Sequence, residues 1–247
     1  MRAGLILKKR DLKVSIYLAT GLETGKAIFN AYFAKGQVNI ATRKRVMMRR
    51  LAKLVEADII RTGVSPLIHG TLYYLSPKGA QFVASRTSWP LEGIWINFNS
   101  ATAEHDLLCS RVAKLIVKEA NEDGRYELNY LMIETELKSG AKLKKGVYFE
   151  DIIFGIQVQR NKIQFSLEGD CGTVSRKDFL GKIGYFSNTI LVLTTTLERL
   201  NLLQQYLKQE GVSKHVYLAT FDHFFNKGLL HCEWHTNFSD ALITLPI

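Results

Sequence analysis

Two β-patterned stretches, residues 147–159 and 163–170, stand only three polar residues apart in the chain. Strands joined by so short a turn are expected to pair, which would bring Asp151 and Glu168 together at one end of a sheet. Carboxylates at adjacent strand ends suit a hard divalent cation, because such an ion takes oxygen ligands. The hairpin therefore predicts an acidic site that holds Mg²⁺ or Mn²⁺.

Positive charge is concentrated in the first third of the chain. The net charge is +10, yet residues 1–90 contain 16 Lys and Arg against 4 Asp and Glu, while the rest of the chain contains 17 against 19. This asymmetry predicts two functional units, of which the first binds nucleic acid. A basic surface that serves solubility alone is the alternative, but it would not require the asymmetry. A metal-holding acidic site in the same chain indicates chemistry on a phosphodiester.

The composition excludes several other classes of protein. Hydrophobic residues make up 47% of the chain and charged residues 23%, as in ordinary globular proteins. No apolar run approaches the roughly 20 residues that cross a bilayer. Residues 1–17 interleave basic side chains with short apolar pieces, unlike a signal peptide, and three scattered cysteines form no disulfide framework. We therefore expect a reduced, cytoplasmic protein without membrane insertion.

The first 88 residues show the order of a winged helix-turn-helix domain. The predicted elements are a helix over residues 22–35, a helix from Asn39 or Thr42 to about Ala57, a hairpin over 59–76 with a long tip at 64–70, and a helix that Ser76 caps and Pro77 opens. The second helix carries one basic face, which is expected to contact DNA through Arg43, Lys44, Arg45, Arg49 and Lys53. A solvated charged helix face is the alternative interpretation.

Residues 85–93 cluster Ser, Thr, Pro and Gly, which predicts a linker between a domain at 1–88 and a second domain at 96–247. The second domain is expected to have the order α-β-β-β-α-β, a mixed sheet flanked by helices, so that the whole chain is of α/β (α+β) class. Its predicted elements are a helix over 103–120, strands over 126–136 and in the hairpin, a helix over 175–186, a strand over 189–195, a helix over 197–209 and a strand over 216–220.

Several motifs together resemble a known family. They are residues 72–79 (Leu-Tyr-Tyr-Leu-Ser-Pro-Lys-Gly), 104–107 (Glu-His-Asp-Leu), 134–136 (Glu-Thr-Glu), 146–151 and 165–173, followed by Lys182 and Tyr185. The chain resembles the replication-relaxation proteins, and among them the MobC class of plasmid mobilisation relaxases, over most of its length. That family pairs a winged helix with a restriction-endonuclease-like domain of the PD-(D/E)XK superfamily.

The resemblance implies a site and a reaction. Asp151 and Glu168 would be direct Mg²⁺ ligands, with Asp170 as a further ligand or as a support for the ligands, and Glu134 or Glu136 would add a carboxylate. Two positions depart from the family pattern, because Glu150 stands where Pro is usual and Asp170 where Lys is usual. Lys177 or Lys182 could supply the cation instead. Tyr148 or Tyr185 could act as nucleophile, and attack by an activated water is equally compatible.

The implied activity is a single-strand nick at the transfer origin of double-stranded plasmid DNA, with accessory mobilisation and coupling proteins as possible partners. One alternative is a winged-helix regulator of replication or transcription with a non-catalytic nuclease fold, and another is a restriction-type endonuclease that cuts both strands. A zinc site at His231, Cys232 and His235 is less favoured, because no second pair of ligands lies at a recognisable spacing.

Overall fold

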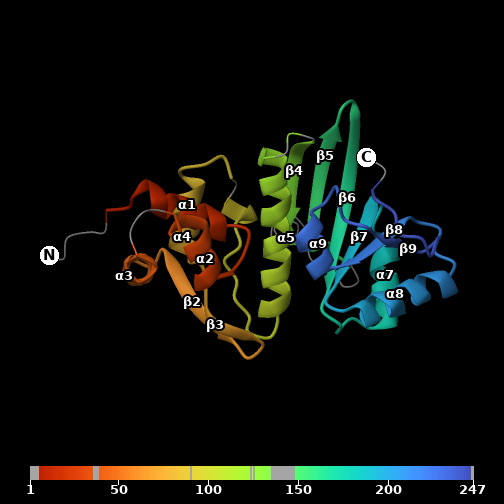
Figure 1. The fold of residues 1–247 in the computed structure, drawn as a ribbon, viewed down its shortest axis with the longest axis horizontal. Coiled ribbons are helices and arrows are strands. Elements are labelled where there is room, and N and C mark those ends of the chain that lie inside the picture. The colour runs from red at the N-terminus through yellow and green to blue at the C-terminus, as the bar shows by residue number, and fades with distance from the viewer. Residues whose placement is uncertain are drawn as a thin grey trace. The chain divides into compact units, whose positions relative to one another are not determined.

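Figure 1 shows a mixed α/β chain with two sheets, which confirms the predicted α+β class. The structure, a computed structural model, describes residues 6–35, 39–89, 91–122, 124, 126–134 and 148–245. The chain divides into two units, Met1–Ser110 and Arg111–Ile247, and the division falls within helix α5 (Ala103–Glu122). Within the described ranges, no helix is long and apolar enough to span a bilayer.

The first unit packs helices against a small antiparallel sheet of order β1-β3-β2. In chain order its elements are α1 (Lys9–Leu18), β1 (Glu23–Thr24), α2 (Gly25–Tyr32), α3 (Ile40–Glu56), β2 (Ile60–Ser65), β3 (Ile68–Leu75), α4 (Pro77–Ala84) and the 3-10 turn η1 (Leu91–Gly93). Each of the four α-helices contributes buried apolar side chains to one core, among them Leu18, Ile28, Leu54 and Val83. Because this core uses one face of each helix, the opposite faces remain available to solvent.

Side-chain caps explain where three of these helices begin. Thr24, Asn39 and Ser76 each accept a hydrogen bond from a backbone N–H two or three residues later, at 3.3, 2.7 and 2.9 Å. Such caps satisfy N–H groups that have no partner within the helix. The predicted helix starts at Asn39 and Ser76 are confirmed, whereas the helix predicted from residue 22 begins only at Gly25.

Two features of the first unit differ from the predictions. The long hairpin tip predicted at residues 64–70 was wrong, because the strands continue to Ser65 and resume at Ile68. Pro66 and Leu67 alone form the turn, and proline favours the second position of a tight turn through its fixed φ. Helix α1 had not been predicted, because buried polar residues interrupt its apolar face.

The first unit continues past the predicted boundary at residue 88. Trp95 is buried, and its N–H donates to the carbonyl of Ala19 at 2.9 Å. The rings of Tyr74 and Phe98 stack with their centroids 5.2 Å apart. Residues that follow the predicted linker therefore cover the first unit.

The second unit is built on a six-stranded mixed sheet of order β4-β5-β6-β7-β8-β9. Its elements are β4 (Glu127–Ile133), β5 (Ile152–Val158), β6 (Asn161–Asp170), α7 (Arg176–Tyr185), β7 (Thr189–Thr194), α8 (Leu197–Gln209), β8 (Val216–Thr220), α9 (Phe221–Lys227) and β9 (His235–Thr236). With α5, these elements follow the predicted order α-β-β-β-α-β as far as β7. Strands β4, β5 and β6 pair antiparallel, whereas β6, β7 and β8 pair parallel.

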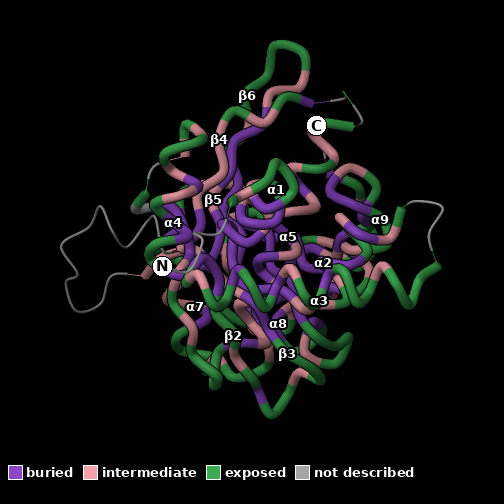
Figure 2. The backbone as a smooth tube through the Cα atoms, turned by 90° about the vertical axis from the view of Figure 1, so that its left-hand side faces the viewer, coloured by how far each residue is buried: buried purple, intermediate pink, exposed green. Residues whose placement is uncertain are grey.

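Strand β6 therefore has an antiparallel neighbour on one side and a parallel neighbour on the other. It is exposed at its start and fully buried from Phe165 to Asp170, as the colours along β6 in Figure 2 also show. Its register pairs Glu168 with Val192 of β7, and Val192 belongs to the core that α7 and α8 form on the sheet. Because side chains alternate along a strand, Glu168 and Asp170 lie on this helix-covered face.

The end of α7 is fixed by one lysine. Lys214 Nζ donates to the carbonyls of Ile183, Gly184 and Phe186, at 3.2, 2.7 and 2.6 Å. The last carbonyls of a helix have no partner within it, and a cation there also complements the helix dipole. This contact helps to hold α7 in place over the sheet.

A buried ion pair joins α1 to α3 in the first unit. Arg50 donates to both carboxylate oxygens of Asp11, and its Nη2 also donates to the carbonyl of Ile6 at 2.9 Å. Burial raises the pKa of Asp11, but hydrogen bonds from Arg50 and from the backbone N–H of Lys8, together with the charge of Arg50, outweigh it. The pKa of Asp11 therefore lies below its ordinary value.

We predict that Asp11→Asn weakens the packing of α1 on α3 by about 2 kcal/mol at neutral pH, because a charge-assisted pair is lost. Because the pKa of Asp11 is lower in the folded than in the unfolded protein, its ionised carboxylate stabilises the fold at any pH above the unfolded pKa of about 3.9. This stabilisation is lost as the pH falls through the folded-state pKa. Hydrogen exchange of the α1 and α3 amides should therefore separate wild type from variant at pH 7 and converge in acid. Asp58→Asn, at the exposed pair with Arg61, is the control and should change little. Equal effects of both variants would contradict the prediction.

Candidate active site

The β5–β6 hairpin brings Asp151 and Glu168 to the same end of the sheet. The backbone N–H of Asp151 donates to the carbonyl of Leu167 at 3.1 Å, which continues the pairing of the two strands. The Asp151 carboxylate accepts a hydrogen bond from the N–H of Gly169 at 2.7 Å. Asp151 is 6% exposed and Glu168 1% exposed, so both acids lie almost entirely inside the protein. The predicted proximity of these two residues is confirmed.

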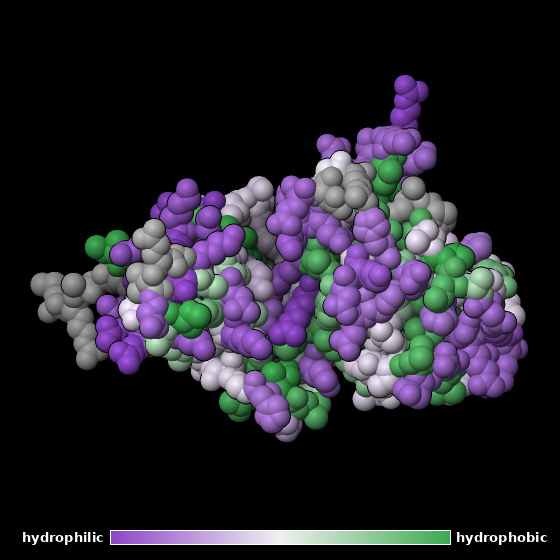
Figure 3. All heavy atoms as spheres, in the orientation of Figure 1, coloured by the Kyte–Doolittle hydropathy of each residue, from purple (hydrophilic) through white to green (hydrophobic). Residues whose placement is uncertain are grey.

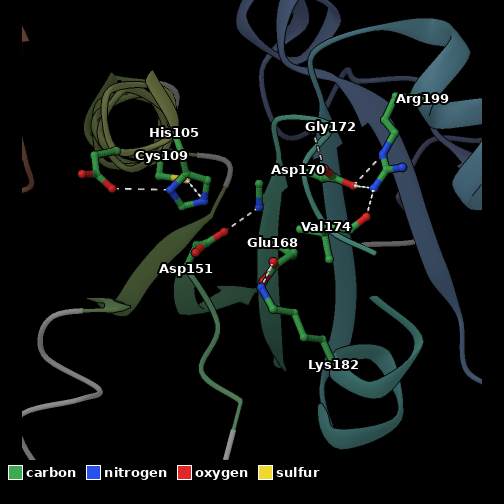
Figure 4. A network of polar contacts seen from close by, with 11 residues as sticks. His105, Cys109, Asp151, Glu168, Asp170, Gly172, Val174, Lys182 and Arg199 are labelled. Carbon is green, nitrogen blue, oxygen red and sulfur yellow. Dashed lines mark hydrogen bonds and ion pairs between the residues drawn. The ribbon is translucent and has the colours of Figure 1, made fainter. Parts of the chain in front are cut away.

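Lys182 of α7 forms an ion pair with Glu168 (Figure 4). Burial alone would lower the pKa of Lys182. The charge and hydrogen bond of Glu168, and then the charges of Asp151 and Glu134, raise this pKa by more than burial lowers it. The net result is a pKa above the ordinary lysine value. The charged form of Lys182 is therefore favoured by the carboxylates around it, of which Glu168 is in direct contact.

Glu134 joins this group from the end of β4. Its backbone N–H donates to the carbonyl of Asp151 at 2.9 Å, which places the two residues next to each other. We call Glu134, Asp151, Glu168 and Lys182 the carboxylate–lysine cluster. Its members come from the ends of three neighbouring strands and from α7. Glu136, the other predicted carboxylate, lies outside the described residues.

Asp170 has a different set of partners. Its Oδ2 accepts hydrogen bonds from Arg199 Nε at 2.9 Å and Nη2 at 2.7 Å, and its Oδ1 accepts from the N–H of Gly172 at 2.6 Å. Arg199 Nη2 also donates to the carbonyl of Val174 at 2.6 Å. Figure 4 shows the Asp170 carboxylate pointing toward Arg199, whereas Glu168 points toward Lys182. These contacts suit a residue that holds the turn after β6, and a direct ligand role for Asp170 stays a prediction.

The sequence interpretation did not include Arg199. Arg199 lies in the first turn of α8, directly after β7, and Thr196 caps that helix. The carboxyl ends of the parallel strands β6 and β7 meet at one edge of the sheet, so a residue just after β7 falls beside Asp170. This topological rule was the signal that could have identified it.

Glu150, just before β5, is tied to the sheet by hydrogen bonds. Its Oε1 accepts from Ser166 Oγ at 3.0 Å, and Asn188 Nδ2 donates to the same Ser166 oxygen at 3.0 Å. Glu150 is half-buried, and Ser166 is fully buried. The extra carboxylate therefore anchors the start of β5 to β6 through a hydrogen-bonded chain.

Of the two candidate tyrosines, Tyr185 lies on α7 and Tyr148 lies just before β5. Tyr185 follows Lys182 by three residues on the same helix, and its side chain is 56% exposed. The rings of Tyr148 and Tyr185 meet edge to face with their centroids 6.2 Å apart. Lys177 is exposed in the first turn of α7, so Lys182 is the lysine that the structure joins to the carboxylates.

His105 has close polar neighbours on its own helix, α5. Its Nε2 lies 3.7 Å from Cys109 Sγ, and its Nδ1 lies 3.4 Å from Asp106 Oδ1. Figure 4 shows His105 and Cys109 side by side on this helix. Residues four apart on a helix share a face, which accounts for the contact with Cys109. Thr102 Oγ1 donates to Asp106 at 3.0 Å and supports the start of the helix.

The predicted DNA-contacting residues all lie on α3. Met47, Leu51 and Leu54 form its buried face, whereas Lys44, Arg45, Arg49 and Lys53 are exposed and Arg43 is half-buried. Figure 3 shows hydrophilic side chains interspersed with hydrophobic ones on the visible face of the first unit. The basic face predicted from the sequence is therefore present at the surface.

Comparisons with protein-family models, with curated proteins and with solved structures find no match to this chain. What the carboxylate–lysine cluster can do chemically follows from its own groups. The charges of three carboxylates act on the Lys182 ammonium, and carboxylate oxygens are the donors that Mg²⁺ or Mn²⁺ prefers. The donor chemistry of the cluster therefore suits such an ion, although among the described residues its three carboxylates are not gathered within the few ångströms that one ion spans.

We predict strong coupling between Asp170 and Arg199. Arg199→Met leaves a fully buried carboxylate without its cation, which costs about 3 kcal/mol of folding free energy. Asp170→Asn together with Arg199→Met should restore much of this loss, because no buried charge then remains. Urea denaturation of the two single variants and the double variant measures the coupling. Additive effects of the two substitutions would contradict the assignment of Arg199 as the partner of Asp170.

Proposed function

We propose that this protein is a two-part DNA-processing enzyme of the plasmid relaxase type, which binds duplex DNA through its first unit and nicks one strand with its second. The observation that carries the proposal is the carboxylate–lysine cluster, in which Glu168 forms an ion pair with Lys182 and the charges of Asp151 and Glu134 also act on that lysine. Clustered acids beside a cation at strand ends are the groups that metal-dependent phosphodiester cleavage requires.

The residues of the cluster have distinct proposed roles. Asp151 and Glu168 would hold Mg²⁺ or Mn²⁺, with Glu134 as a further oxygen donor. The ion, when bound, would neutralise charge on the phosphate and lower the pKa of a water molecule. Lys182 keeps its proton, because of its raised pKa, and is suited to stabilise negative charge that develops on the phosphate. It would thus replace the lysine of the family motif, whose position Asp170 occupies.

Topology supports the proposed assignment of both domains. In the first unit, the order α1-β1-α2-α3-β2-β3, with β1 paired to β3, is what a winged helix-turn-helix requires. In the second, the order α-β-β-β-α-β with β6 parallel to β7 is what a restriction-endonuclease-like core requires. The basic face of α3 would then lie in the major groove.

The exposed hydroxyl of Tyr185 makes it the preferred nucleophile if the nick proceeds through a covalent attachment. Attack by an activated water is the alternative, and the cluster suits either. Transfer-origin DNA is the proposed substrate, and mobilisation and coupling proteins are the proposed partners. These last assignments rest on the sequence resemblance.

One observation favours a second candidate function. Both carboxylate oxygens of Asp170 are bonded within the protein, and Glu168 is paired with Lys182. Internal pairing of this kind also suits a purely structural network. The second candidate is therefore a DNA-binding regulator of replication or transcription whose second unit is not catalytic.

We predict that the protein converts supercoiled plasmid carrying its own origin to open circles in Mg²⁺ or Mn²⁺, and not in EDTA. Asp151→Asn and Glu168→Gln should abolish nicking because they remove ligand charge. Lys182→Ala should slow nicking by about 10²–10³-fold, the usual effect of losing one charge-stabilising group. Gel electrophoresis of the plasmid topoisomers measures all four proteins.

Lys177→Ala is the matched control, because Lys177 lies on the same helix but is exposed in its first turn. It should nick at the wild-type rate. Linear product would indicate a restriction-type enzyme instead. Tight binding of origin DNA with no cleavage by the wild-type protein would favour the regulator.

We also predict that Arg45→Ala weakens DNA binding and lowers the slope of log affinity against log salt by about 0.9, the value for one phosphate contact. Arg45 is exposed on α3 and takes no part in the buried core. Fluorescence anisotropy with a labelled duplex over a range of KCl concentrations measures the slope. A slope equal to that of the wild type would remove this residue from the interface.

A further inference from the structure

Two grooves in the first unit run along the sides of α3. The first, of about 700 Å³, lies between α1 and α3. The second, of about 590 Å³, lies between α3, the start of α2 and the start of β3. Both are formed within the first unit alone.

The helical repeat shows how α3 separates these grooves. Val46, Arg50 and Lys53 line the first groove, whereas Lys44 and Met48 line the second. Successive residues turn by about 100°, so these two sets fall on opposite sides of the helix. Arg45 lines neither groove and projects between them, opposite the buried face of α3, while its neighbours Arg49 and Ala52 line the near side of the first groove. Helix α3 is therefore a ridge with a groove on each flank.

The rims of both grooves are cationic. The first is lined by six cationic side chains and two acidic ones: Lys8, Lys9, Arg10, Arg49, Arg50, Lys53, Asp11 and Glu56. Asp11 and Arg50 neutralise each other through their buried ion pair, so the remaining positive charge faces the groove. The second groove is lined by Lys26, Lys44 and His69 and by no acidic residue among those described. Each groove thus complements a polyanion.

We propose that the groove between α1 and α3 holds one phosphate backbone of a DNA duplex, with Lys8 and Lys9 of the α1 end as its contacts, while the second groove holds the other backbone. This rests on the proposed binding of DNA by α3. A helix with its side chains is about 10–12 Å across, and the major groove of DNA is about 12 Å wide and flanked by two backbones. A ridge with a cationic groove on each flank has the matching shape.

An acidic protein segment fits these observations less well. An acidic helix would fill one groove and leave the other groove and the basic ridge between them unused. A duplex engages all three at once. The proposal also adds α1, which lies outside the helix-turn-helix segment itself, to the predicted interface of Arg43, Lys44, Arg45, Arg49 and Lys53.

The test compares two double variants of the full-length protein that remove the same charge. Lys8→Gln/Lys9→Gln alters the groove, and the control Lys13→Gln/Arg86→Gln alters exposed cations of the same unit that line neither groove. The probes are a fluorescein-labelled duplex of mixed sequence, a single strand of the same length and a polyglutamate peptide. Circular dichroism establishes that both variants keep the wild-type helix content.

With the duplex, Lys8→Gln/Lys9→Gln should lower the slope of log affinity against log salt by about 1.8, which corresponds to two phosphate contacts at about 0.9 each. The control should keep the wild-type slope. Equal losses in both double variants would overturn the proposal, because net charge alone would then explain them. So would polyglutamate or single-stranded binding that exceeds duplex binding and depends on Lys8 and Lys9.

Different binding results would contradict the groove contact at Lys8 and Lys9 and the proposed DNA-binding function. If Arg45→Ala lowers the slope and Lys8→Gln/Lys9→Gln does not, α3 binds DNA and the groove beside α1 lies outside the interface. If the wild-type protein does not bind the duplex at all, the proposed DNA-binding function itself is wrong.

Discussion

The pairing of β6 with two different kinds of neighbour determines most of the second unit. The antiparallel hairpin with β5 sets Asp151 beside Glu168, and the parallel pairing with β7 sets the start of α8 beside Asp170. A parallel neighbour requires a crossover, and α7 provides it while carrying Lys182 over the same sheet face. Strand β6 thereby carries the two acids, Glu168 and Asp170, and its pairing places the cations of α7 and α8 beside them.

The burial of the β6 carboxylates has a cost in folding free energy. Glu168 and Asp170 are about as buried as apolar core residues, and a buried carboxylate is costly unless a cation or hydrogen bonds compensate it. Each acid has its own cation, Lys182 for Glu168 and Arg199 for Asp170. The two pairs also differ in exposure, because Lys182 is 22% exposed and Arg199 14%. The pair that is closer to solvent belongs to the cluster in which Asp151 and Glu134 also participate.

Local patterns predicted the parts of this protein that local physics determines. Alternating residues and a three-residue turn predicted the β5–β6 hairpin, and the capping residues Asn39 and Ser76 predicted two helix starts. The partner of Asp170 lies 29 residues away, so its identity depends on the strand order, which no local pattern contains. Whether Lys177 or Lys182 contacts Glu168 likewise depends on which face of α7 packs on the sheet, and this packing is not contained in the local sequence.

Two contacts explain how the sheet holds a buried acid at position 170. An acid at the end of β6 adds a buried negative charge, which Arg199 and the N–H of Gly172 compensate. The other buried acid of β6, Glu168, has its cation on α7, where Lys182 forms an ion pair with it. The side chain of position 170 faces the same helix layer as Glu168. Each buried acid of β6 is thus matched by a cation from a helix, Lys182 of α7 for Glu168 and Arg199 of α8 for Asp170.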